Sequence, residues 1–299
     1  MRFVGQATIK SYLAVEIKHA KSGHPMEHVL FTGPAGMGKS TLAKLIAQDL
    51  GAELHAYVAD KSWTAQKVYQ ELLKFDITGY TKDGRMLPNA RKHVIFMDEA
   101  HLLPAHEPWY SVLQECAIYV NGREAWLPEI TFIGATNVPV FPKAFLDRIP
   151  LKFRFEPYTI DELQQIVQDA FPRIPNGDAR DIAVRSRSTA RIALHYAAAY
   201  VKHGGLSFFA RLGIDELGLC PLDRKYLDAL HSYNRPLSLN SLASIIGEDK
   251  KSIEANVEPY LKQLGMLIVT DRGRVLAEGG TIAERGPRYR VETLERSIA

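Results

Sequence analysis

The chain has 299 residues, which is enough for two or three domains that each bury a hydrophobic core. Its 46% hydrophobic and 24% charged residues are typical of a globular protein, and no apolar run approaches the roughly 20 residues that span a membrane. The net charge of +3 is too small to indicate a nucleic-acid partner by itself.

The amino terminus lacks the apolar core and the cleavage site of a signal peptide. Two cysteines, Cys116 and Cys220, are too few for a disulfide framework and have no metal-ligand spacing. We therefore expect a protein of the reducing cytoplasm, without a membrane partner.

Continuous apolar strands alternate with helices over about the first 155 residues. We expect strands at 28–32, 54–58, 94–97, 131–135 and 151–155. A helix should follow the first of them, because apolar residues from Leu42 to Leu50 recur at spacings of three and four, and Gly51 ends it. This pattern predicts an α/β domain with a parallel sheet that helices cover on both faces.

The second half of the chain is predicted to be mostly helical. Thr159 and Glu162 have the spacing of a capping box, and helical periodicity continues to about Gly205. From about Asp215 the pattern predicts a winged helix. It has helices at 224–230, 238–246 and 252–264, an apolar stretch at 266–270, a turn at 271–274 and a last strand at 275–277. Pro259 is expected to kink the third helix.

A glycine-rich loop follows the first strand and matches G-x-x-x-x-G-K-[ST] at every fixed position. Its glycines let backbone N–H groups face phosphates, and the helix start adds partial positive charge. We expect Lys39 to reach the β- and γ-phosphates and Ser40 to coordinate Mg²⁺. ATP and Mg²⁺ are therefore the predicted cofactors. The residues assigned to nucleotide binding here are Gly33, Pro34, Ala35, Gly36, Met37, Gly38, Lys39, Ser40 and Thr41.

The strand expected at 94–97 ends in two carboxylates, Asp98 and Glu99. Asp98 can supply the hard oxygen ligand that Mg²⁺ requires, and Glu99 is then available to polarise the water that attacks the γ-phosphate. His101 completes an Asp-Glu-Ala-His string, which raises the alternative of a two-domain helicase of the DEAH type. The remaining residues do not supply a second domain of that kind, so we interpret His101 as a local feature.

Beyond these motifs, the chain resembles the RuvB family of hexameric AAA+ motors, which drive branch migration of Holliday junctions. The resemblance covers residues 4–276. The motifs that carry it are Gly134-Ala-Thr-Asn137, Phe145-Leu-Asp-Arg148 and Ser188-Thr-Ala-Arg191. It implies that Asn137 is the first sensor of the γ-phosphate. By the same resemblance, Arg148 is an arginine finger that acts on the neighbouring subunit's ATP, and Arg191 contacts phosphates within its own subunit. Val4 and Tyr158 would then lie beside the adenine.

The same resemblance implies three domains. Residues 1–156 would form the AAA+ ATPase domain, 157–214 a helical lid and 215–299 a winged-helix DNA-binding domain. Arg272 and Arg274 flank a turn glycine and are expected to project from the tip of the wing toward DNA phosphates. The implied partners are duplex or four-way junction DNA and a ring of identical subunits, six in the family.

Two segments depart from the family's pattern. Residues 118–127 read as a hairpin around an Asn121–Gly122 turn, where the family grips its partner RuvA, but the segment is shorter than the family's. A RuvA-like loading partner is therefore left open. Residues 75–92 are longer than in the family and partly basic, and we favour a solvated loop for them.

Another class of function remains possible from the sequence. A clamp loader or protein-remodelling ATPase would share the phosphate loop, the acidic strand end and the trans-acting arginine. Clamp loaders, however, end in a helical collar, whereas this chain ends in a winged-helix pattern. A small-molecule kinase is disfavoured, because it would not need that domain.

Overall fold

The computed structural model describes residues 3–75, 91–104, 106–120 and 123–277. The chain forms two compact units, Met1–Glu156 and Pro157–Ala299. Among the described residues, no helix is both long enough and apolar enough to cross a bilayer.

The first unit is built on a five-stranded parallel sheet with the order β2-β3-β6-β1-β7. Its strands are β1 (Val29–Thr32), β2 (Glu53–Val58), β3 (His93–Asp98), β6 (Ile130–Thr136) and β7 (Leu151–Arg154). Each predicted strand is confirmed to within one residue at either end. The predicted α/β class with a parallel sheet is therefore correct.

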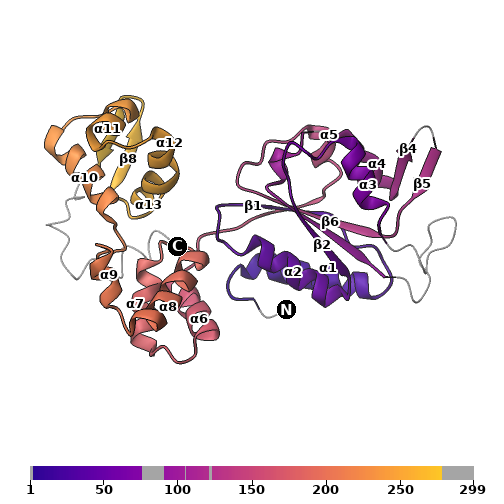
Figure 1. Cartoon of the computed structure of the whole chain (residues 1–299), viewed down its shortest axis with the longest axis horizontal. Helices are drawn as coiled ribbons and strands as arrows, with labels where there is room; N and C mark the ends of the chain where they lie inside the picture. The colour runs from indigo at the N-terminus through magenta and orange to yellow at the C-terminus, as the bar shows by residue number, and fades with distance from the viewer. Residues whose placement is uncertain (1–2, 76–90, 105, 121–122, 278–299) are drawn as a thin grey trace. The chain divides into compact units, whose positions relative to one another are not determined.

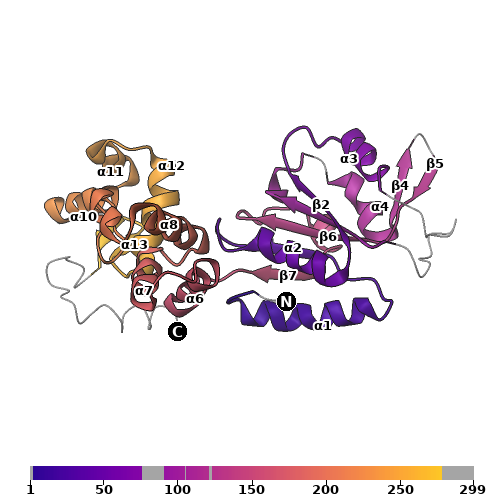
Figure 2. The same cartoon turned by 60° about the horizontal axis from the view of Figure 1, so that its bottom comes forward.

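Helices cover both faces of this sheet (Figures 1 and 2). One face carries α1 (Ala7–Lys21) and α2 (Lys39–Leu50), and the other carries α3 (Ala65–Leu72), α4 (Glu107–Glu115) and the short α5 (Lys143–Leu146). A 3₁₀ turn, Ala100–Leu102, follows β3. The α1 helix was not predicted, although its buried residues have helical spacing; they are Ile9, Leu13, Ile17 and Ala20.

The predicted hairpin is present as β4 (Ala117–Val120) paired with β5 (Arg123–Trp126) in antiparallel register. The Asn121–Gly122 turn lies outside the described residues, and so does most of the 75–92 segment.

The second unit begins with four helices, α6 (Ile160–Ala170), α7 (Asn176–Arg185), α8 (Ala190–His203) and α9 (Ser207–Arg211). The predicted capping box starts α6. Glu162 N–H donates to Thr159 Oγ1 at 3.2 Å, and Thr159 N–H donates back to the Glu162 carboxylate at 2.9 Å. Two backbone N–H groups that have no carbonyl partner within the helix are thereby hydrogen-bonded.

The winged-helix pattern is confirmed in α10 (Pro221–Tyr233), α11 (Leu239–Ile246) and an interrupted third helix, followed by the hairpin β8 (Leu267–Thr270) and β9 (Gly273–Leu276). The third helix consists of α12 (Lys250–Ser252), a π turn (Ile253–Val257) and α13 (Glu258–Gln263). Pro259 therefore does not kink a continuous α-helix. It lies in the first turn of α13, where its missing N–H disrupts no interior hydrogen bond.

Arg274 departs from its predicted position at the tip of the wing. It lies within β9, where its backbone pairs with Leu237 at 2.8 and 3.0 Å, so the turn is confined to Asp271 and Arg272. Its Nε donates to Glu258 Oε1 at 2.8 Å, and Glu258 is only 2% exposed. The Arg274 side chain therefore folds back onto the domain, whereas Arg272 is exposed.

We expect Arg274→Met to destabilise the winged helix by about 3 kcal/mol, because the buried Glu258 carboxylate would lose its closest cationic partner. Burial tends to raise the pKa of the Glu258 carboxyl, but hydrogen bonds from Arg274, Lys262 and Tyr226 outweigh burial and hold this pKa below its ordinary value. The stabilisation is thus present above the unfolded pKa of about 4.3 and is lost as the pH falls through the folded pKa.

Hydrogen exchange of the 215–277 amides, measured from pH 7 down to pH 3, checks this prediction. The penalty of Arg274→Met should be largest at neutral pH and should shrink below about pH 4. Arg272→Met, at the exposed turn, is the matched control and should change stability by less than about 0.5 kcal/mol. Equal effects of the two substitutions would contradict the structural role of Arg274.

Candidate nucleotide-binding site

The phosphate loop needs glycine at three of its positions. Gly33, Gly36 and Gly38 have φ values of 135°, 82° and 89°, in the region that side chains disfavour. A Cβ on Gly33 would also lie 3.0 Å from the Phe155 carbonyl oxygen, so the loop packs directly on the backbone that follows β7. The loop therefore turns tightly from β1 into α2, as phosphate binding requires.

Lys39 is held over this loop. Its Nζ donates to the carbonyl oxygens of Gly33 and Pro34, each at 2.7 Å, and the residue is 8% exposed. These contacts keep the ammonium charge at the place where the loop's N–H groups would hold a phosphate chain. The side chain therefore needs little ordering when an anion binds there.

Ser40 and Asp98 fit a magnesium ion. Ser40 Oγ lies 3.5 Å from Asp98 Oδ2, and the other oxygen of Asp98 accepts a hydrogen bond from Glu99 N–H at 3.0 Å. Adjacent oxygen ligands of octahedral Mg²⁺ lie about 3 Å apart, so both oxygens can reach one ion after a small adjustment. These two side chains, predicted from separate motifs, are brought together by the fold.

Glu99 connects to a residue that the sequence analysis set aside. Glu99 has a φ of 50°, which turns the chain sharply after β3. Its carboxylate lies 3.5 Å from His101 Nδ1, which in turn lies 2.9 Å from Thr136 Oγ1 at the end of β6. His101 is thus the middle member of a polar chain between two strand ends. The only feature of the sequence that could have indicated this contact is the position of His101, two residues after Glu99.

Asn137 immediately follows Thr136 and is exposed. Thr136 pairs with Thr32, and the Thr136 carbonyl accepts a hydrogen bond from Gly33 N–H at 3.1 Å. The end of β6 is therefore bonded to the first residue of the phosphate loop. This contact joins the residue before Asn137 to the phosphate loop.

Arg148 lies just after α5 and does not contact the phosphate loop in any interaction found among the described residues. Its Nη1 donates to Ala144 O at 2.7 Å, and its guanidinium stacks over the Tyr110 ring with 4.7 Å to the centroid. The side chain is therefore held in place by α4 and α5.

Val4 belongs to a segment that is tied to the end of the first unit. Gln6 Nε2 donates to Glu156 O at 2.8 Å, and Glu156 N–H donates to Gln6 Oε1 at 3.2 Å. This two-bond clamp holds the 4–6 segment at the residue that precedes the boundary between the units. Val4 itself is partly buried.

Tyr158 and Arg191 belong to the second unit. Tyr158 is buried, and burial is the main cause that raises the pKa of its phenol. Tyr158 N–H donates to Ser188 O at 3.2 Å, and Arg191 is exposed in the first turn of α8. The structure thus links Tyr158 to the turn that starts the helix carrying Arg191.

That turn is also joined to the winged helix. Arg187 and Ser188 have φ values of 52° and 51°, which is unusual for residues other than glycine. Arg187 Nη2 donates to Asp223 Oδ1 at 3.1 Å and to Asn256 O at 2.9 Å. Ser188 Oγ accepts from Gln263 Nε2 at 2.6 Å. These bonds hold the start of α8 to α10, the π turn and α13.

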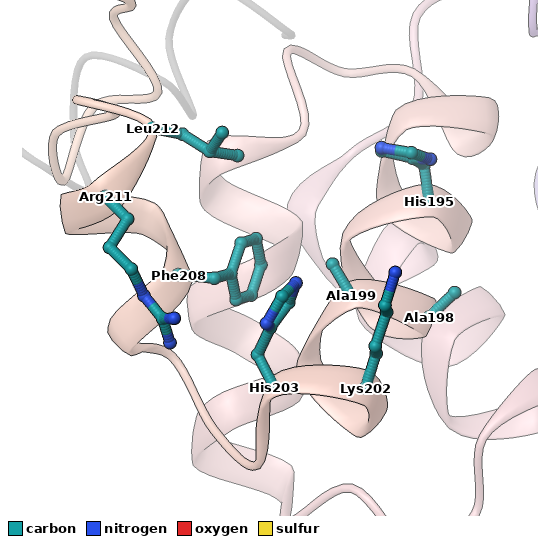
Figure 3. Close-up of a pocket in the computed structure, with 8 residues that line it drawn as sticks. All are labelled: His195, Ala198, Ala199, Lys202, His203, Phe208, Arg211 and Leu212. Carbon is teal, nitrogen blue, oxygen red and sulfur yellow. The ribbon is translucent and has the colours of Figure 1, made fainter.

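A cavity of about 390 Å³ lies between α8 and α9 (Figure 3). Its walls carry nitrogen-bearing side chains around an aromatic ring, and they include no residue predicted to bind nucleotide. The lining residues are His195, Ala198, Ala199, Lys202, His203, Phe208, Arg211 and Leu212. This cavity therefore does not belong to the nucleotide site.

The Glu99–His101–Thr136 chain leads to a prediction. We expect His101→Ala to lower the rate of ATP turnover about 10-fold without changing the KM for ATP, because the polar contact of His101 Nδ1 with the Glu99 carboxylate, which helps to orient that carboxylate, is lost. Steady-state turnover measures both constants. His101→Asn should restore part of the rate, and His24→Ala, at an exposed histidine, is the control. An unchanged rate in His101→Ala would show that the contact does not position Glu99.

Comparison with known proteins agrees with this geometry. The family model described as the Holliday junction DNA helicase RuvB P-loop domain matches residues 1–156, and the RuvB C-terminal winged helix domain matches residues 216–283.

Curated relatives and solved structures point the same way. The Holliday junction branch migration complex subunit RuvB of Campylobacter fetus is 33% identical, covering 92% of this chain and 84% of its own length. The subunit from Solibacter usitatus is 34% identical, with 92% and 85% covered. The structure named as the Thermotoga maritima RuvB Holliday junction branch migration motor superposes with a TM-score of 0.73 at 28% identity, covering 92% of this chain and 93% of that one. The chain belongs to the RuvB family of P-loop motors for Holliday junction branch migration.

Proposed function

We propose that this chain works as a ring of identical subunits, six by analogy with its family, which hydrolyses ATP between subunits and moves duplex DNA through a four-way junction. The observation that carries the proposal is the convergence of the phosphate loop, Asp98, Glu99 and Asn137 at one edge of the parallel sheet.

In this proposal, each nucleotide-site residue has a separate role. Ser40 and Asp98 hold Mg²⁺, which neutralises phosphate charge when bound, and Glu99 orients the attacking water. Lys39 and Arg191 contact phosphates, and Asn137 senses the γ-phosphate. Val4 and Tyr158 lie beside the adenine. Backbone N–H groups of the loop from Ala35 to Thr41 donate to the phosphates, whereas Gly33, whose N–H is bonded to Thr136 O, and Pro34, which has no N–H, shape the turn that brings the loop to them.

Arg148 completes the site of the adjacent subunit. Its contacts with Ala144 and Tyr110 support this role, since neither partner belongs to the phosphate loop of its own subunit. Stacking on Tyr110 also holds the guanidinium in one orientation, which suits an arginine that must meet another subunit's phosphates.

A mixing experiment tests the trans role. Arg148→Ala and Glu99→Gln alone should each retain ATP binding and lose turnover, with a loss of about 10³-fold or more for the arginine. Co-assembled, they should recover turnover, because an Arg148→Ala subunit keeps Glu99 and receives Arg148 from its Glu99→Gln neighbour. Failure of every mixture to recover turnover, in rings confirmed by mass photometry to contain both variants, would assign Arg148 to its own subunit or remove it from the site.

DNA binding is assigned to the wing, and specifically to Arg272. This residue is exposed at the turn between β8 and β9, whereas Arg274 is committed to Glu258 and Glu254. An arginine at an exposed hairpin turn suits contacts with phosphates, which supply affinity and not sequence readout.

We expect Arg272→Ala to weaken DNA binding uniformly across sequences and to lower the salt slope by about 1. Fluorescence anisotropy with duplex and junction DNA over a salt series measures both quantities. Arg180→Ala, which removes an exposed arginine paired with Asp161, is the control. An unchanged affinity and slope would move the DNA contact away from the wing turn.

A loading protein of the RuvA type would dock on the β4–β5 hairpin. Directly opposed pairs place Ala117, Tyr119, Glu124 and Trp126 on one face of the hairpin, and both aromatic side chains are exposed. An exposed aromatic face of this kind favours a protein partner. Because this hairpin is shorter than the family's, it would contact the loading protein over a smaller area.

A further inference from the structure

Three side chains that can bind a metal ion lie near the amino ends of the strands, whereas the candidate nucleotide site lies at the carboxyl ends. Glu53 and His55 are on β2, an outer strand, and His93 is the first residue of β3. Glu53 and His93 pair in register as the first residues of their strands, and His55 lies two residues further along β2 on the same face of the sheet. The phosphate loop, by contrast, follows the carboxyl end of β1.

The distances in this group match those of a coordinated ion. His55 Nε2 lies 3.0 Å from His93 Nδ1 and 4.0 Å from Glu53 Oε1, and the three ligand atoms are all within 4.8 Å of one another. Two nitrogens bound to one tetrahedral zinc ion at about 2.05 Å lie roughly 3.3 Å apart. The imidazoles are therefore already near this separation, and the exposed Glu53 carboxylate lies beside them, with its Oε1 4.0 Å from His55 Nε2.

His55 is half-buried and His93 is buried, so the two rings have little freedom to move apart. A direct hydrogen bond between the two rings is the competing explanation of the same 3.0 Å contact.

An aromatic side chain packs on both rings, while the carboxylate of the group is exposed among the described residues. Phe75 stacks on His55 with 3.9 Å between ring centroids and lies 5.1 Å from the His93 ring. Arg91 Nη1 lies 3.6 Å from the second Glu53 oxygen, Oε2. Glu53 is exposed on the outer strand, so water can supply a fourth ligand.

We propose that Glu53, His55 and His93 bind a divalent transition-metal ion of the zinc type, with water as the fourth ligand. Two imidazoles and one carboxylate suit zinc better than Mg²⁺, which prefers an all-oxygen set. The bound ion cross-links β2 to β3 at the point where Phe75 and Arg91, the described residues on either side of 76–90, both contact the cluster. The site is independent of ATP turnover and of the proposed ring.

Cobalt provides the direct test, because tetrahedral Co²⁺ absorbs visible light much more strongly than six-coordinate Co²⁺. The full chain, free of any histidine tag and stripped with chelator, is titrated with Co²⁺ in excess Mg²⁺, and Zn²⁺ is then added. We expect one equivalent to produce the tetrahedral spectrum and Zn²⁺ to abolish it. Calorimetry with Zn²⁺ alone gives the affinity.

Matched variants separate coordination from a simple hydrogen bond. His55→Gln should remove the spectrum, and Glu53→Gln should weaken Zn²⁺ binding at least 10-fold. His19→Gln combined with His24→Gln should change neither result, although these two rings also stack, with 3.9 Å between centroids. The proposal is overturned if the wild-type chain takes up no stoichiometric Co²⁺ or Zn²⁺, or if His55→Gln binds both as the wild type does. Circular dichroism verifies that each variant is folded.

Discussion

The parallel register of three neighbouring strands determines where this protein can perform chemistry. In the order β3-β6-β1, all three strands point the same way, so their carboxyl ends meet at one edge. The phosphate loop follows β1, Asp98 ends β3 and Asn137 follows β6. The hydrogen bond from Gly33 N–H to Thr136 O connects two of these ends directly. Residues about 100 positions apart in the sequence thereby form one site.

Tight backbone packing supports that edge. Gly33 lies so close to Phe155 that a Cβ would be 3.0 Å from the Phe155 carbonyl oxygen and would force a shift, and Gln6 is hydrogen-bonded to Glu156, the next residue. The phosphate loop and the amino-terminal 4–6 segment are thus held by the same stretch of backbone after β7. Loss of packing at Phe155 would disturb both of them, because neither has much freedom to adjust.

In the second unit, a single turn serves two purposes. Arg187 and Ser188 bond to α10, the π turn and α13, while Ser188 also accepts the Tyr158 N–H and precedes Arg191 by one helical turn. Tyr158, proposed to lie beside the adenine, and the winged helix, proposed to bind DNA, are therefore bonded to the same turn.

Much of the architecture was predictable because its signals are local. Buried parallel strands are continuous apolar runs, and the phosphate loop has fixed glycine positions, so both were located within a residue. The missed features depend on contacts between distant residues. His101 gains a role only when β6 brings Thr136 to it, and the Arg274 side chain turns inward only because Glu258 is buried nearby. The α1 helix was missed for another reason, because the helical spacing of its apolar residues was already visible in the sequence.

Junction movement coupled to ATP turnover is the most direct test of the central claim. The measurement follows branch migration of a synthetic four-way junction and ATP hydrolysis in the same reaction, with Glu99→Gln in parallel and linear duplex as the DNA control. The account predicts junction-stimulated turnover and junction movement by the wild-type chain, and loss of both in Glu99→Gln. Turnover that ignores every DNA, with no junction movement, would contradict it and leave only the ATPase fold.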